Sequence, residues 1–161
     1  MTDLSETAAA GSIPTDAQLI AMAFEATKHS YAPYSNFPVG AALLLDDGSV
    51  VTGCNVENAS YGLTMCAERS AVFRMVAEKG PKHRILACAI VGAKAAPCHP
   101  CGACRQVLHE FGCERVIVER ERPEQSVDQQ GSAAAKEIVL GEPESIDFAK
   151  ILPYAFGPED L

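Results

Sequence analysis

Three cysteines and a glutamate have the residue types and spacing that zinc chemistry needs. Cys101 and Cys104 stand three residues apart at the expected start of a helix, so both sulfurs lie on one face of it, one turn apart. Cys66 stands in the expected first turn of another helix, where the helix dipole favours a thiolate. A Cys-x-x-Cys pair alone is ambiguous among a redox pair, half of a structural zinc site and chance. Three thiolates from two helix starts predict an incomplete tetrahedron around zinc.

Glu68, two residues after Cys66, decides between a structural and a catalytic metal. A structural zinc site closes with a fourth protein ligand, which Cys98 or His99 could supply, whereas a catalytic site keeps that position for water. A water on zinc needs a carboxylate beside it to move its protons. We therefore expect one catalytic zinc ion on the three cysteines, with Cys98 and His99 as spectators.

Composition excludes several classes of function. The chain has 161 residues, 48% of them hydrophobic, which suits one globular domain. Its formal charge of −8 disfavours a nucleic-acid partner, because Lys and Arg supply most of the affinity for phosphates. Seven cysteines, an odd number, argue against a disulfide scaffold. The longest apolar run, 85–93, is too short to span a membrane, and the acidic N-terminus is unlike a secretory signal. We expect a cytoplasmic protein with a small-molecule substrate and no membrane partner.

The elements that must position these residues alternate between strands and helices. Asp46-Asp47-Gly48 predicts a tight turn between two strands, and Gly80-Pro81 ends the helix that follows Cys66. We expect a flexible tail over 1–13 and a single domain over 14–161, with a long polar loop at about 120–136. The alternation predicts an α/β fold with helices on the faces of a mixed sheet. Strands are expected over 39–45, 49–55, 85–92, 115–119 and 137–140, and helices from Thr15 or Asp16, over 64–79 with Thr64 as N-cap, over 100–111 and over 144–151.

Several further motifs occur in a recognisable order with the zinc motif. They are Asn55-Val-Glu-Asn-Ala-Ser-Tyr61, Cys66-Ala-Glu-Arg69, Pro100-Cys-Gly-Ala-Cys-Arg-Gln106 and Leu152-Pro-Tyr-Ala-Phe-Gly-Pro-Glu-Asp-Leu161. With them the chain resembles the small homotetrameric zinc-dependent cytidine deaminases over 14–118 and 138–161. The resemblance implies a three-layer α/β/α sandwich with a mixed five-stranded sheet, one Zn²⁺ per chain and a homotetramer with shared active sites.

The resemblance also implies a reaction. In that family a zinc-bound hydroxide attacks C4 of cytidine or 2′-deoxycytidine, which yields uridine or 2′-deoxyuridine and ammonia in pyrimidine salvage. By this likeness Glu68 is the catalytic proton shuttle. Arg69 is implied to hydrogen-bond the ligand sulfurs and offset their negative charge, with a solvated helix arginine as the alternative.

Four residues are implied to bind the nucleoside within one subunit. Asn55 and Glu57, two apart at a strand end, point to the same face and suit a ribose 3′-hydroxyl; a solvated strand end is the alternative. Phe37 resembles a pocket wall against the pyrimidine, with a core phenylalanine as the alternative. The backbone N–H of Ala67 is implied to bind the pyrimidine O2.

Three more residues are implied to act between subunits. Ala59 and Tyr61 match positions that reach the site of an adjacent subunit. Phe156 matches a phenylalanine that crosses into a neighbouring subunit and stacks on its pyrimidine, with folding back onto its own core as the alternative. A C-terminal segment with Tyr154 and Phe156 between prolines is not expected to leave both rings in water.

Three rival functions share parts of this pattern. A blasticidin S-type deaminase has the same Cys-x-Glu and Pro-Cys-x-x-Cys core, but the motif at 55–57 and the Phe-Gly-Pro C-terminus argue against it. A polynucleotide deaminase needs a basic surface, which the charge of −8 denies. A structural zinc module would bind the metal without turnover.

Overall fold

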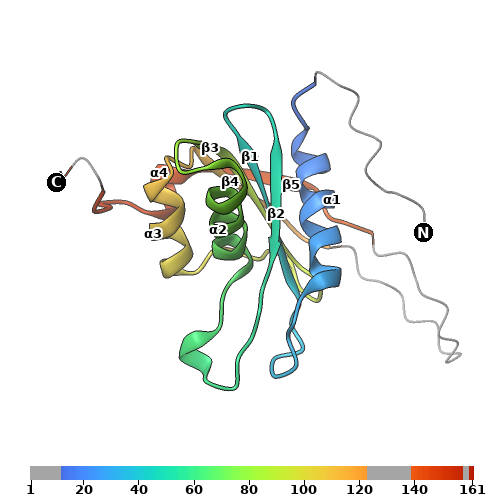
Figure 1. Cartoon of the computed structure of the whole chain (residues 1–161). Helices are drawn as coiled ribbons and strands as arrows, with labels where there is room; N and C mark the ends of the chain where they lie inside the picture. Colours follow the sequence, from blue (N-terminus) through green and yellow to red (C-terminus); the bar gives the residue numbers. More distant parts are fainter. Residues whose placement is uncertain (1–11, 123–138, 158–159) are drawn as a thin grey trace, which may run out of the picture.

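A mixed β-sheet runs through the centre of the computed structural model, which describes residues 12–122, 139–157 and 160–161 (Figure 1). The sheet has five strands in the order β2-β1-β3-β4-β5; β3 and β4 are parallel, and the other neighbouring strands are antiparallel. This confirms the expected mixed five-stranded sheet. The strands are β1 (Val39–Leu45), β2 (Val50–Cys54), β3 (Ile85–Gly92), β4 (Arg115–Glu119) and β5 (Pro143–Asp147).

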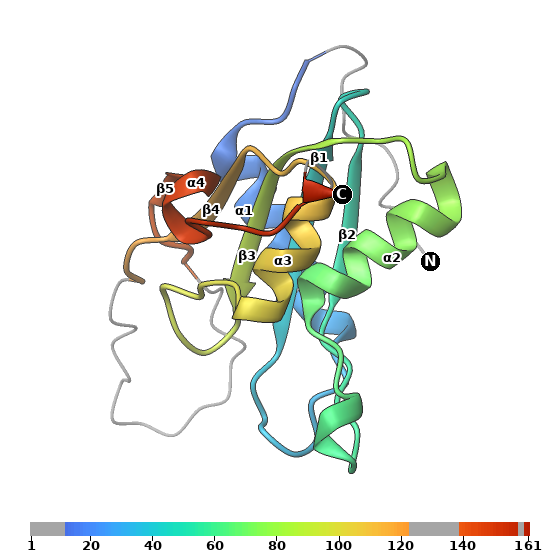
Figure 2. The ribbon, with the colours of Figure 1, turned by 90° about the vertical axis from the view of Figure 1, so that its left-hand side faces the viewer.

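Helices cover both faces of the sheet, as the expected three-layer architecture requires. α1 (Asp16–Ala26) lies on one face, and α2 (Ala67–Lys79) and α3 (Gly102–Glu110) lie on the other (Figures 1 and 2). Because both faces are covered, β1 and β3 are apolar and buried at nearly every position. A short helix, α4 (Phe148–Ile151), follows β5, and two 3₁₀ turns span Thr27–His29 and Tyr61–Leu63.

Two glycines allow the helices to approach the sheet closely. A Cβ on Gly40 of β1 would lie 1.9 Å from the carbonyl oxygen of Ala23 in α1. A Cβ on Gly53 of β2 would lie 2.4 Å from the amide nitrogen of Ala71 in α2. The first turns of α2, near Ala67 and Ala71, therefore pack directly against the backbone of β2 at Gly53.

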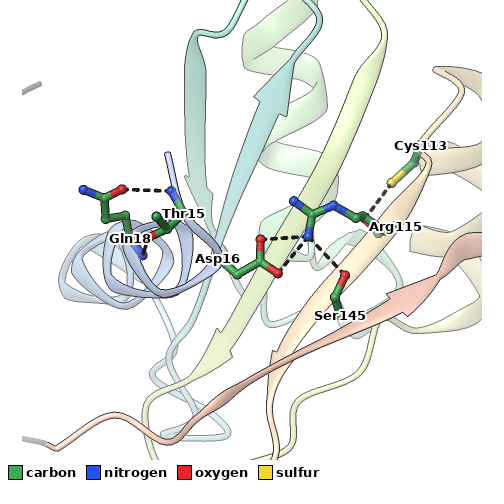
Figure 3. Close-up of polar contacts among 6 residues, drawn as sticks. All are labelled: Thr15, Asp16, Gln18, Cys113, Arg115 and Ser145. Atoms are coloured by element: carbon green, nitrogen blue, oxygen red, sulfur yellow. Dashed lines mark hydrogen bonds and ion pairs between the residues drawn. The ribbon is translucent and has the colours of Figure 1, made fainter. Parts of the chain in front are cut away.

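The start of α1 is held by a cap and an ion pair (Figure 3). The Thr15 hydroxyl accepts a hydrogen bond from the Gln18 N–H, and the Gln18 side chain accepts one from the Thr15 N–H. This capping box confirms Thr15 as the helix start. Arg115 of β4 donates to both carboxylate oxygens of Asp16 at 2.8 and 2.9 Å and to the Ser145 hydroxyl of β5 at 3.0 Å, which ties the helix to the sheet.

Three expected boundaries are wrong, two of them because of pairing between distant segments. Helix α2 begins at Ala67 with Cys66 as N-cap, instead of at Thr64, because Met65 pairs with Val56 in an extended bridge. Helix α3 begins at Gly102 with Cys101 as N-cap, instead of at residue 100. The last strand is 143–147, where the sequence predicted the first half of a helix, because these residues pair with β4.

Other expectations agree with the structure or lie outside the described residues. Strands over 39–45, 85–92 and 115–119 are confirmed, and Gly48 has a positive φ of 79° at the β1–β2 turn, which a glycine adopts without strain. The expected strand 137–140 is not present at 139–140, and residues 137–138 lie outside the described ranges. So do most of the expected tail over 1–13 and most of the expected loop at 120–136, so the domain division stays a prediction. Within the described ranges, no helix has the length and apolar character to cross a membrane.

Candidate active site

Two helix starts bring three thiols together. Cys66 is the N-cap of α2, Cys101 is the N-cap of α3, and Cys104 lies in the first turn of α3. The three sulfur atoms all lie within 4.8 Å of one another, and Cys66 Sγ is 3.9 Å from Cys101 Sγ. Both helices point their N-terminal ends, which carry partial positive charge, at this cluster. The sequence therefore predicted the right three cysteines to be neighbours, although it placed both helix starts too early.

The surroundings of the cluster favour the thiolate form of Cys66, whereas hydrogen bonding with Cys66 and burial raise the pKa of the Cys104 thiol. Hydrogen bonding with Cys104, and further hydrogen bonds from Arg69 and Cys101, lower the pKa of the Cys66 thiol to about 5. Arg69 Nη2 donates to Cys66 Sγ at 3.5 Å and to the Thr64 carbonyl at 3.4 Å. Arg69 therefore contacts a sulfur of the cluster directly, as its expected role requires, and is not a solvated helix arginine.

The cluster suits a zinc ion. Zinc takes thiolates at about 2.3 Å in a tetrahedron, which places two such sulfurs about 3.8 Å apart. The Cys66–Cys101 sulfur separation of 3.9 Å agrees with this value, and the lowered pKa of Cys66 supplies the charged form that metals bind. Cys101 is exposed, so the cluster is open to solvent on one side. Three thiolate ligands and an accessible side are the arrangement of a catalytic zinc site.

The remaining cysteines are separate from this cluster. Cys98 packs half-buried against the core, and burial raises the pKa of its thiol to about 11. His99 is exposed. Burial likewise raises the pKa of Cys54, Cys88 and Cys113. Cys88 and Cys113 are buried core residues, as expected, whereas Cys54 is half-buried at the end of β2.

Glu68 lies against the thiols in the first turn of α2. Its side chain is buried, with the residue 4% exposed, and it interacts with the Cys104 side chain. Burial raises the pKa of this carboxyl, since a low-dielectric environment disfavours its charged form. Ala67, between Cys66 and Glu68, is the first residue of the helix, where backbone N–H groups have no partner within the helix. A carboxyl group and a free N–H donor thus flank the three sulfurs.

A hollow of about 350 Å³ lies between the segments before β1 and after β2. These two segments pair through Tyr31 and Val56. Glu57 lies in this hollow, where it accepts hydrogen bonds from the Tyr34 N–H at 2.8 Å and from the hydroxyl and N–H of Ser35. These bonds, led by that of the Ser35 hydroxyl, lower the pKa of Glu57 and keep it charged. The hollow is lined by Tyr34, Ser35, Glu57, Tyr61 and Thr64.

Asn55 is buried and makes more hydrogen bonds within the chain than its place in the motif indicated. Its carbonyl oxygen accepts from the Ser30 hydroxyl and from the Val39 N–H at 2.8 Å, and its amide nitrogen donates to the Phe37 carbonyl at 3.0 Å. The residue is buried, which excludes the alternative of a solvated strand end. One amide hydrogen is left over for a ligand after these bonds.

The expected aromatic residues occupy different environments. The half-buried Phe37 ring packs on Gly92, where a Cβ would lie 2.8 Å from Phe37 Cζ. Tyr61 is exposed, with its ring centroid 6.1 Å from that of Tyr34, and Ala59 is exposed nearby. Both Tyr61 and Ala59 are accessible from outside the chain.

The C-terminal segment runs across α3 (Figure 2). Gln106 Nε2 donates to the Phe156 carbonyl at 2.8 Å, and Arg105 Nη1 donates to the Ile151 carbonyl at 2.8 Å. The Phe156 residue is 61% exposed and Tyr154 is fully exposed. Within this single chain Phe156 therefore does not fold back onto its own core, and the expectation that a neighbouring subunit covers these rings stays a prediction.

Comparison with protein-family models assigns these residues to a known group. The model described as "Cytidine and deoxycytidylate deaminase zinc-binding region" matches residues 13–120, which include all three thiols and Glu68. The chain belongs to this deaminase family. Zinc is accordingly the cofactor of the family, and Cys66, Cys101 and Cys104 form a group that is able to hold one such ion.

Relatives within the family match most of the chain. A cytidine deaminase of Sporosarcina psychrophila is 40% identical over 146 residues, covering 89% of this chain and 93% of the relative. A cytidine deaminase of Halalkalibacterium halodurans is 42% identical over 143 residues, covering 89% and 95%. The crystal structure of the cytidine deaminase from Burkholderia pseudomallei has a TM-score of 0.69 at 41% identity, covering 89% of this chain and all of that one. These likenesses confirm the expected α/β fold and family.

Ser35 and Thr64 are site residues that sequence analysis missed. Ser35 contacts Glu57 across 22 residues of sequence, and Thr64 presents its carbonyl to Arg69. No spacing motif marks either residue: the Ser35 contact depends on how two loops meet, and the Thr64 contact depends on the extended segment just before α2.

Proposed function

We propose that this chain is a zinc-dependent hydrolase that converts cytidine and 2′-deoxycytidine to uridine and 2′-deoxyuridine with release of ammonia. The observation that carries this proposal is the meeting of three thiols and a buried Glu68 at the starts of α2 and α3. The family match and relatives named cytidine deaminase at about 40% identity support the substrate class.

Glu68 is proposed to move the protons of the reaction. A zinc ion on Cys66, Cys101 and Cys104 would act as a Lewis acid that activates water for attack on the pyrimidine. Addition of water at C4 and departure of the amino group require one proton at N3 and one at the leaving nitrogen. The Glu68 carboxyl, held against the thiols and shielded from bulk solvent, is the group placed to carry both.

The nucleoside is proposed to lie between the thiols and the hollow. The base would contact the Phe37 ring and the Ala67 N–H, and the sugar 3′-hydroxyl would contact Glu57 and the remaining amide hydrogen of Asn55. In support, Asn55 bonds directly to the Phe37 carbonyl, so the two ends of this binding surface are joined. Arg69 would offset the negative charge of the ligand sulfurs.

A homotetramer with shared active sites is proposed to complete the site. The exposed Phe156 ring, on a segment anchored by Gln106, is available to reach a neighbouring subunit, as are Ala59 and Tyr61. A role in pyrimidine salvage in the cytoplasm is also proposed. All seven cysteines are free thiols, which suits a reducing compartment.

The test is the loss of cytidine absorbance on mixing with the purified protein, with and without a chelator. We expect turnover of cytidine and 2′-deoxycytidine, much lower turnover of free cytosine, and loss of activity after chelation. Turnover of blasticidin S but not of cytidine would favour the aminopyrimidine nucleoside deaminase alternative. Bound zinc with no turnover of any of these compounds would favour a structural zinc module.

A further inference from the structure

The Ser35 hydroxyl joins two residues that are proposed to touch opposite ends of the nucleoside. Its oxygen accepts a hydrogen bond from the Phe37 N–H at 3.0 Å, and its hydrogen is donated to Glu57 Oε1. A hydroxyl can donate one hydrogen bond while accepting another, which makes serine suited to this position. Ser35 thus connects the Phe37 segment to the Glu57 carboxylate.

The hydrogen bonds of Glu57 leave one oxygen partly available. Each carboxylate oxygen has two lone-pair sites. Oε2 uses both on backbone N–H groups, those of Tyr34 at 2.8 Å and Ser35 at 3.2 Å. Within the described part of the chain, Oε1 accepts only from the Ser35 hydroxyl, which leaves one of its sites for a ligand hydroxyl, and Glu57 lines the hollow. The Ser35 bond therefore sets which way that site points.

The turn that carries Ser35 is locally defined. The Asn36 N–H donates to the Ala32 carbonyl at 3.0 Å, and Asn36 has a positive φ of 51°, a conformation that asparagine tolerates better than most residues. This turn directs the Ser35 hydroxyl back toward both Phe37 and Glu57. The hydroxyl is therefore presented by a fixed backbone, although the side chain itself is exposed.

We propose that Ser35 is a positioning residue for sugar recognition, which aims Glu57 Oε1 at the nucleoside 3′-hydroxyl and couples it to the Phe37 segment. This inference rests on the proposed function. It assigns to Ser35 an effect on substrate binding and none on the chemical step, because Ser35 contacts neither the thiols nor Glu68 in the described structure.

The test compares Ser35→Ala with the unchanged protein on three nucleosides. A hydrogen bond to a charged group is worth about tenfold in affinity or more, so we expect KM for cytidine and 2′-deoxycytidine to rise about tenfold, with kcat within about twofold. For 3′-deoxycytidine, which lacks the hydroxyl, the rise in KM should be less than about threefold. Ser35→Thr, which keeps the hydroxyl, should restore most of the affinity. In a Glu57→Gln background, Ser35→Ala should add less than about twofold, since the two residues act together.

Ser49→Ala is the matched control. The Ser49 hydroxyl also bonds a carboxylate, that of Asp47, but at the β1–β2 turn, so this variant should leave all KM values unchanged. If Ser35→Ala fails to fold, Ser35→Cys, which is similar in shape and a weaker donor, replaces it. Equal rises in KM for cytidine and 3′-deoxycytidine, or no rise for cytidine, would overturn the inference. An unchanged protein that does not deaminate cytidine would refute the proposed function instead.

Discussion

Replacement of Gly53 in β2 by alanine should displace the start of α2 and thereby reduce the activity of the candidate active site. A Cβ at this position would lie 2.4 Å from the Ala71 nitrogen and 2.7 Å from the Ala67 carbonyl oxygen, whereas ordinary contact begins at 3.4 Å. Both neighbours are backbone atoms of α2, so a side-chain rotation cannot relieve the clash. The first two turns of α2 must move away from β2 by about 1 Å to restore contact distance.

The shift would displace Cys66 and Glu68 relative to Cys101 and Cys104, which α3 holds in place. A misplacement of about 1 Å can cost about 10²-fold in rate, so we expect kcat for cytidine to fall about 10- to 100-fold. Overpacking costs about 1–3 kcal/mol in free energy of unfolding, which corresponds to about 2–12 °C in Tm. The assay is kcat per folded chain, measured with Tm and zinc content.

Gly40→Ala separates loss of stability from damage to the site. Its Cβ would lie 1.9 Å from the Ala23 carbonyl oxygen, so it forces α1, on the opposite face, away from β1. No proposed site residue lies on α1, and Gly40→Ala should therefore lower Tm while preserving kcat per folded chain. Gly62→Ala, with no atom within 4 Å of its Cβ, should change neither quantity. The reasoning is refuted if Gly53→Ala retains full kcat, or if Gly40→Ala reduces kcat equally.

Three further predictions concern individual residues in or near the site. Glu68→Gln should retain zinc while kcat falls by at least the roughly 10²–10⁴-fold typical of a general acid–base, and a loss below about tenfold would assign the proton transfer elsewhere. Cys98→Ser should be purified with zinc and activity intact; a zinc-free protein would show that the ligand assignment is wrong. Glu68→Ala and Phe156→Ala subunits, refolded together, should bind cytidine more tightly than Phe156→Ala alone, because some sites with an intact Glu68 then receive an intact Phe156 ring from a neighbouring subunit. If the mixture shows only the diluted activity of the Phe156→Ala protein, a shared site is excluded.

Local patterns were sufficient to predict the central strands and the identity of the three thiols. Apolar runs bounded by turn residues placed β1, β3 and β4 at their observed bounds. The Cys-x-x-Cys spacing places two sulfurs on one face of a helix, one turn apart. The third cysteine, Cys66, stands two residues before Glu68, and this pair indicated the third zinc ligand and the catalytic carboxylate. These features depend on neighbours within a few residues, which a sequence displays directly.

Features that depend on distant partners were missed. β5 reads as part of a helix by itself, and pairing with β4 makes it a strand. Glu119, 1% exposed, is paired with Arg122, whose guanidinium also donates to the carbonyls of Gly92 and Ala93 at the end of β3. The bond from Ser35 to Glu57 likewise joins residues 22 apart. Such contacts are decided by how loops meet, and no short motif encodes them.

The most direct test of the central claim is a zinc titration of the metal-free protein, followed by cytidine turnover. The claim is that Cys66, Cys101 and Cys104 hold the one metal ion on which deamination depends. Turnover should rise in proportion to added zinc and saturate at one equivalent per chain, and Cys101→Ser should show no such rise. Cytidine turnover by the metal-free protein, or full activity in Cys101→Ser, would contradict the claim.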